Sequence, residues 1–211
     1  MFFCIRWDLD YVPWDTPDAI EFGHGEPAML IRILDFARER GLRFQFCASN
    51  RVLRAFPALG DAILDHGHDL DWYCKHPLEP EMRWPTAQEL FSRLGKQPEG
   101  IAFKTPPPPQ SSLDSTFRWT CGGALSGVFE IPVQLFSLHT DLTSGVGYKK
   151  CLDDVSKFLH PQLRPCCLAI RPQDLRQFDP RLGGLDQLFK LCDEDAIPIL
   201  TLRQANQTLV G

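Results

Sequence analysis

The sequence FFCIRWDLD (residues 2–10) decides the fold class that we expect. Residues 2–7 are mostly apolar and β-prone, which is typical of a strand that a parallel sheet buries on both faces. Asp8 and Asp10 follow directly on this strand. Because a desolvated carboxylate is costly without a partner, the pair predicts a metal ion, a basic partner or a water-filled cleft at the strand's end. The alternative interpretation is that both acids cap the next segment, since D-x-D alone is a weak motif.

Helix and strand patterns alternate along the rest of the chain. After the first strand, an amphipathic helix is predicted over 27–40 and ends at Gly41. Further helices are predicted at 51–65 with a break at Pro57, at 86–94 with Thr86 as N-cap, and near 184–194. Further strands are predicted at 42–49, 100–109, 127–135, 167–170 and 196–202, the second of these ended by prolines. Residues 67–73 are predicted to form a short strand or a turn. This alternation predicts an α/β protein: a distorted (β/α) barrel of about seven strands in a single domain, 1–211, with a doubly wound sheet as the alternative.

The composition narrows the possible classes of protein. With 211 residues, 44% hydrophobic and 23% charged, the chain can bury a sizeable core. A net charge of -5 without a Lys/Arg run predicts no nucleic-acid partner and no attraction to anionic membranes. The eight cysteines contain no C-x-x-C, and no apolar run reaches membrane-spanning length. Together with the absence of a secretory pattern at the N-terminus, these features favour a reduced, cytoplasmic protein.

Polar side chains follow most of the predicted strands. If the strands form a barrel, these residues converge on one mouth, because barrel chemistry gathers at the carboxyl ends of the strands. Carboxylate and imidazole ligands suit zinc or another divalent first-row ion, which turns a bound water into a nucleophile. The residues concerned are Asp8, Asp10, Asp69, Asp71, His76, Lys104, Glu130 and Arg171.

Seven short motifs, in this order and spacing, resemble the NodB-type polysaccharide deacetylases. The resemblance implies a distorted (β/α) barrel and metal-dependent removal of acetyl groups, commonly from N-acetylated sugars. It covers nearly the whole chain, although each motif is short and several are altered. The motifs are DLD (8–10), GLRFQF (41–46), HGHDLDWYCKHP (66–77), FKTP (103–106), FEIPVQL (129–135), IRPQD (170–174) and ILTLRQA (199–205).

The resemblance also implies roles for individual residues at a metal centre. It makes Asp8 the general base, and Asp10 and His76 ligands of a divalent metal that is expected to be zinc. The family's first ligand histidine falls at Trp72, which cannot ligate a metal. Asp71, next to that position, is therefore the candidate for the third ligand.

Two further family positions are changed in this chain. The arginine that orients the base falls at Lys104, which keeps the charge but loses the fork geometry of a guanidinium. The histidine that protonates the leaving group falls at Arg171, a poor proton donor that can instead stabilise an oxyanion or bind a phosphate or carboxylate. His139 is expected to be exposed or to cap a helix, and His68 to lie at the surface or brace a loop. Trp14 or Trp72 is expected to line the cleft.

Two functions remain open on the sequence. The first is a metal-dependent hydrolase that removes an acyl group from a small or carrier-linked acylated sugar, or a related amide or ester. The second is a catalytically impaired domain of the same fold that binds a carbohydrate or an anionic ligand. The preserved Asp8 and Asp10 favour the hydrolase, whereas Trp72 and Arg171 favour the binding domain.

Overall fold

The computed structural model describes residues 2–10, 26–74, 80–103, 117–119, 134–159 and 165–210. Its centre is a sheet in the order β5-β4-β3-β2-β1-β7-β6, with β8 also paired to β1. All pairings in it are parallel except the one between β4 and β5. The strands are β1 (Phe3–Leu9), β2 (Gln45–Ala48), β3 (Asp69–Cys74), β4 (Gly100–Phe103), β5 (Phe117–Trp119), β6 (Gln134–Ser137), β7 (Cys166–Ile170) and β8 (Ile199–Leu200).

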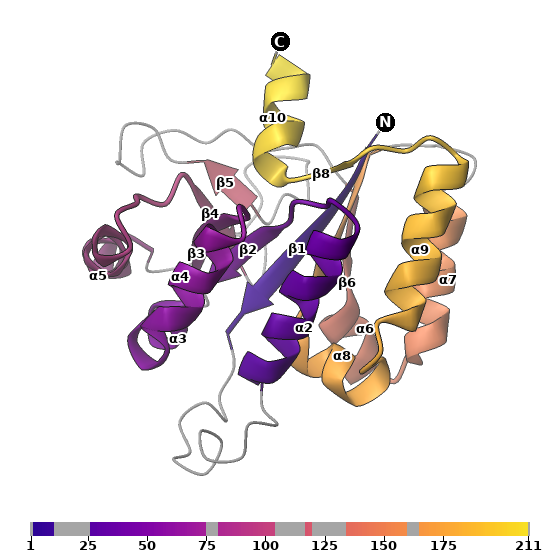
Figure 1. Ribbon diagram of the computed structural model, residues 1–211, viewed down its shortest axis with the longest axis horizontal. Coiled ribbons are helices and arrows are strands. Elements are labelled where there is room, and N and C mark those ends of the chain that lie inside the picture. Colours follow the sequence, from indigo (N-terminus) through magenta and orange to yellow (C-terminus); the bar gives the residue numbers. More distant parts are fainter. Residues whose placement is uncertain are drawn as a thin grey trace.

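Helices cover the outside of this curled sheet (Figure 1). The exception is α10, which stands at the end of the sheet where the N-terminus lies. The described helices are α2 (Glu26–Glu39), α3 (Asn50–Ala55), α4 (Pro57–Asp65), α5 (Pro80–Arg93), α6 (Leu138–Thr143), α7 (Tyr148–Leu159), α8 (Pro172–Phe178), α9 (Gly183–Glu194) and α10 (Leu202–Val210). The strand order, with β1 between β2 and β7, is that of a barrel left open rather than of a doubly wound sheet.

The apolar and the charged side chains of β1 lie on different faces of the strand, because successive strand residues point to opposite faces. Phe3, Ile5 and Trp7 face the helices and belong to the larger hydrophobic cluster. Residues of the other parity, including Arg6 and Asp8, are buried on the concave face. The first strand therefore does what its composition predicts: it is buried on both sides, and its charged residues share one of them.

Most of the predicted elements are present, and one prediction about a helix end is wrong. The helix predicted over 27–40 is α2, and Gly41 follows it with φ +63, as a glycine C-cap requires. Thr86, however, lies inside α5, which begins at Pro80 and also contains Pro85. Proline at the first position of a helix loses no hydrogen bond. Burial of Trp84 and its neighbours on α5 offsets the one bond that Pro85 removes.

His68 is the loop-bracing residue that the sequence predicts. Its ring is buried against Phe44 and Phe46, and its Nδ1 accepts a hydrogen bond of 3.2 Å from the backbone N–H of Phe44. Burial, together with the nearby charges of His66 and Arg43, lowers the pKa of His68 to about 4. The folded protein therefore holds this ring neutral.

Acid is expected to destabilise the protein through His68. Because the folded pKa lies below the unfolded value of about 6.5, this contribution to stability is complete above that pH and is lost as the pH falls through 4. Between pH 7.5 and pH 4.5, the free energy of unfolding of His68→Gln should therefore fall by about 1–2 kcal/mol less than that of the wild type. Urea unfolding at the two pH values measures this difference. Asp65→Asn, a change at an exposed carboxylate at the end of α4, is the control. Equal acid losses in wild type and His68→Gln would contradict this assignment.

The described cysteines are buried in the core. All of them are free and buried: Cys4, Cys47, Cys74, Cys151, Cys166, Cys167 and Cys192. Buried thiols of this kind pack as small hydrophobic side chains. Among the described helices, none combines the length and the apolar run that crossing a bilayer requires.

Candidate functional site

Three neighbouring strands build a small cavity at the concave face. Their register places Arg6 of β1 beside Ala169 of β7, and Ala169 beside Ser137 of β6. Two residues further along each chain segment come Asp8, Arg171 and His139, which lie toward the carboxyl ends of the strands. The described residues that line the cavity are Arg6, Asp8, Tyr73, Ser137, His139, Thr140, Ala169 and Arg171. The cavity is about 30 Å³, room for a water or two.

Asp8 is held in this cavity by Arg6, its neighbour on the same face of β1. The Nε of Arg6 donates to Oδ1 of Asp8 at 2.7 Å, and Nη2 donates to Oδ2 at 2.7 Å. Arg6 and Asp8 are only 3% and 6% exposed. A two-pronged guanidinium–carboxylate pair fixes the orientation of the carboxylate plane. Arg6 therefore already supplies the guanidinium that the family resemblance places at Lys104, a residue outside the described part of the chain.

Burial has the largest effect on the pKa of Asp8. Desolvation raises the pKa of its carboxyl group above the ordinary value, while Arg6 and, more weakly, Arg171 act against this rise. The nearby carboxylate of Asp10 raises the pKa further. An aspartate with a raised pKa that remains oriented by an arginine is suited to accept a proton.

Tyr73, and not Trp72, is the residue of β3 that reaches the cavity. Trp72 is 1% exposed and points toward the helices, where its ring lies 5.4 Å from that of Trp84. The expectation that Trp72 lines the cleft is therefore wrong for the described cavity, because its strand parity is opposite to that of Asp71 and Tyr73. Trp14 lies outside the described residues. Burial raises the pKa of Tyr73, so its hydroxyl stays protonated and available as a donor.

His139 enters the same cavity from the first turn of α6. Its Nδ1 lies 3.1 Å from Oδ1 of Asp174, which belongs to the first turn of α8. The side chain of His139 is 33% exposed and that of Asp174 is 10% exposed. The expectation of an exposed or capping role for His139 is therefore wrong, since β6 and β7 pair side by side and bring the two helix starts together.

The predicted metal ligands are only partly described. Asp10 is buried directly after β1, 7% exposed, at the carboxyl end where the prediction places a metal. His76 lies outside the described residues. Within the described ranges, no three His, Cys, Asp or Glu side chains gather into a metal-binding group. The carboxylate of Asp10 and an imidazole are a donor set that suits zinc, so the fit of a metal depends on His76.

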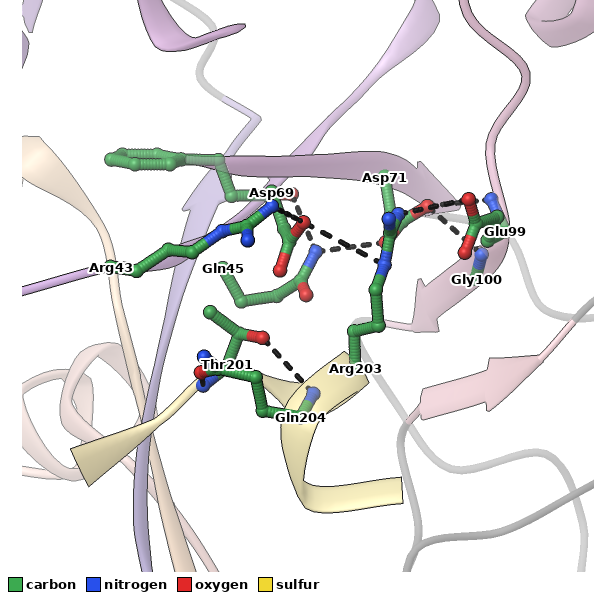
Figure 2. A network of polar contacts seen from close by, with 10 residues as sticks. Arg43, Gln45, Asp69, Asp71, Glu99, Gly100, Thr201, Arg203 and Gln204 are labelled. Atoms are coloured by element: carbon green, nitrogen blue, oxygen red, sulfur yellow. Dashed lines mark hydrogen bonds and ion pairs between the residues drawn. The ribbon is translucent and has the colours of Figure 1, made fainter. Parts of the chain in front are cut away.

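Asp71 makes contacts that the sequence did not indicate (Figure 2). Its Oδ1 accepts the backbone N–H groups of Glu99, at 2.7 Å, and of Gly100, at 3.0 Å. Its Oδ2 accepts Nε2 of Gln45 at 2.9 Å. These bonds tie β3 to β2 and to the start of β4. Whether Asp71 also ligates a metal stays a prediction.

The N-terminal end of α10 lies beside Asp71, near the end of the sheet where β3 begins (Figure 2). Nε of Arg203 lies 3.6 Å from Oδ1 of Asp69, and its Nη2 lies 3.1 Å from Oε1 of Glu99. Arg43 also donates to Oδ1 of Asp69, at 2.8 Å. Asp69 is therefore an ion-paired residue at the start of β3, away from the cavity at the carboxyl ends of the strands.

Comparison with known proteins identifies the fold. No protein-family model matches the sequence, and no curated protein sequence does. Among solved structures, peptidoglycan deacetylase PdaC from Bacillus subtilis has a TM-score of 0.60 and 11% identity, covering 98% of this chain and 90% of its own. A family 4 acetyl xylan esterase from Clostridium thermocellum, in complex with a cobalt ion, has a TM-score of 0.59 and 13% identity, covering 99% and 91%.

A third similar structure is a CE4 family pseudoenzyme from Bacillus anthracis. It has a TM-score of 0.59 and 10% identity, and the match covers 97% of this chain and 64% of that one. The fold expected from the resemblance is thus confirmed: this chain has the fold of the CE4, or NodB-type, deacetylases. At such identities the likeness concerns the fold, and similar structures include both active enzymes and a pseudoenzyme.

Proposed function

We propose that this chain, with the fold of the CE4 deacetylases, is a divergent metal-dependent hydrolase that removes an acyl group from a sugar or a related small or carrier-linked molecule. We further propose that residues 1–211 form one deacetylase-like domain and that it works in the cytoplasm. The observation that carries the proposal is Asp8: a buried carboxylate at the carboxyl end of β1, oriented by Arg6 and facing a cavity. A buried carboxylate with a perturbed pKa beside a cavity is a candidate for a catalytic group.

In the proposed reaction, Asp8 accepts a proton from the attacking water while Arg6 holds the carboxylate in place. The water oxygen bonds to the acyl carbon, and the carbonyl oxygen gains negative charge. Arg171, which lines the same cavity, is placed to stabilise this charge, as the sequence predicts for an arginine at that position. We also propose that Lys104 helps to orient Asp8, the role that the family resemblance gives it.

Asp10 and His76 are the proposed metal ligands, with Asp71 the predicted third. A bound zinc or similar ion would lower the pKa of water and polarise the acyl group. Asp10 fits this role by its place directly after β1 and by its effect on the pKa of Asp8. The substrate class is proposed from the similar structures, which are named for peptidoglycan and acetyl xylan.

Metal content is the measurement that tests this proposal. Elemental analysis of the purified protein should find about one divalent ion per chain, as in sites with three protein ligands. Asp10→Asn and His76→Ala should each lose the ion, because each removes one of the ligands. His66→Ala, a change at an exposed histidine, is the matched control and should retain it. A wild type that binds no zinc, cobalt or nickel would refute the metal-dependent hydrolase.

One observation favours the alternative, a domain that binds an anionic carbohydrate without turning it over. Both oxygens of Asp8 are engaged by Arg6, and Arg171 adds a second guanidinium to the cavity. Because Asp8 compensates the charge of Arg6, the guanidinium of Arg171 is the group that would attract a carboxylate or a phosphate. Calorimetric binding of an acidic sugar by a metal-free wild type, with no hydrolysis, would support this second function.

A further inference from the structure

The hydrolysis proposed above lacks a proton donor for the leaving group. The resemblance places that donor at Arg171, whose guanidinium remains protonated at any working pH and transfers its proton poorly. An amine or an alcohol leaves slowly as its anion, so a general acid is needed beside the cavity. Arg171 caps the N-terminus of α8, where its charge can attract an anion but cannot replace an acid.

His139 is the only histidine among the described residues that lines this cavity. It comes from α6, whereas Arg171 comes from the neighbouring β7–α8 junction, so the two side chains meet from different elements. Its ring is partly exposed, 33%, which allows the second ring nitrogen to reach a bound molecule. Asp8, the proposed base, lines the same small space.

Asp174 holds the ring of His139 in place. Oδ1 of Asp174 lies 3.1 Å from Nδ1, and Asp174 belongs to the same IRPQD motif as Arg171. A carboxylate on Nδ1 fixes the proton on that nitrogen in the neutral ring and leaves Nε2 to exchange protons with a substrate. This motif, which has no histidine of its own, thus supplies the partner of a histidine from helix α6.

We propose that His139, positioned by Asp174, is the general acid of this site, and this inference rests on the proposed hydrolase function. After water has added to the acyl carbon and Asp8 has taken its proton, the bond from that carbon to the leaving nitrogen or oxygen breaks. The leaving atom takes the proton from Nε2 of His139. The products are the free acid and the amine or alcohol, and the proton held by Asp8 returns to His139 through water. His139 is a catalytic residue in this scheme, and Asp174 is a positioning residue.

The leaving group provides the test, because only a poor leaving group needs a proton. Two probes are compared: tri-N-acetylchitotriose, whose amine must be protonated, and 4-nitrophenyl acetate, whose phenolate leaves without a proton. His139→Gln should lower kcat on the sugar amide by about 100-fold and on the aryl ester by less than about fivefold. Asp174→Asn should lower kcat on the amide by about tenfold, and it should again lower kcat on the aryl ester much less. His66→Gln is the control histidine and should change neither.

The possible results separate this inference from the function on which it rests. Equal losses on both probes in His139→Gln would overturn the general-acid assignment, while wild-type activity would still support a hydrolase. A wild type that hydrolyses neither probe, nor any sugar in a screen of acetylated sugars, would refute the hydrolase and this inference with it. In an NMR spectrum that correlates ring nitrogens with carbon-bound protons, neutral His139 should carry its proton on Nδ1. A proton on Nε2 would overturn the assignment even if the variants failed to fold.

Discussion

Asp8→Asn is expected to lower hydrolysis of an acylated sugar by about a thousandfold, because it removes the general base. It should leave the metal content unchanged, since Asp10 and His76 are the proposed ligands. The measurement is kcat on the substrate that a screen of acetylated sugars identifies, together with elemental analysis. Asp154→Asn, which neutralises an exposed carboxylate paired with Lys150 on α7, is the control.

The same change has a second effect, because Asp8 and Arg6 form a buried pair. Asparagine leaves the guanidinium of Arg6 without a compensating charge, which should lower the free energy of unfolding by about 3 kcal/mol. A double variant, Arg6→Gln with Asp8→Asn, replaces the ions by two amides that can hydrogen-bond to each other. It should regain most of the lost stability in urea unfolding, but no activity.

This pair of variants separates a catalytic Asp8 from a structural one. If the double variant regained both stability and activity, the loss in Asp8→Asn would be a folding defect and Asp8 would not be the base. If Asp8→Asn kept full activity, the hydrolase mechanism would lose its central residue. Loss of metal in Asp8→Asn would instead make Asp8 a ligand.

Strand parity explains which features of the site were predictable. The period of two along β1 already places Arg6 and Asp8 on one face, so the ion pair could have been predicted from RWD alone. The same rule applied to β3 sets Trp72 apart from Asp71 and puts Tyr73 on the concave side. The family resemblance places the cation that orients the base at Lys104, whereas Arg6, two residues before Asp8, binds both of its oxygens.

Other features depend on long-range pairing and could not be predicted. His139 and Asp174 lie 35 residues apart and meet only because β6 pairs with β7. Helix α10 is an intermediate case, since its start carries a recognisable signal. Thr201 and Gln204 exchange backbone-to-side-chain hydrogen bonds of 2.8 and 3.2 Å, which is the capping box of a T-x-x-Q pattern.

Asp71→Ala is expected to lower the free energy of unfolding by about 3 kcal/mol, because it leaves the buried N–H of Gly100 without its acceptor and removes the shorter of the two hydrogen bonds that the amide of Gln45 donates. Asp71→Asn should behave differently. Its Oδ1 can accept the same backbone N–H groups, and its Nδ2 can donate to Oε1 of Gln45, which has no hydrogen-bond partner among the described residues. Urea unfolding of both variants at pH 5 measures the difference.

The pH dependence of Asp71→Asn distinguishes a bracing residue from a metal ligand. Burial raises the pKa of Asp71 to about 6, so its contribution to stability is complete below the unfolded value of about 4 and is lost as the pH rises through 6. Asparagine does not ionise. The variant should therefore gain about 3 kcal/mol relative to wild type between pH 4 and pH 8. Were Asp71 instead a metal ligand, asparagine would release the ion, and the variant would be less stable than the metal-loaded wild type at pH 8.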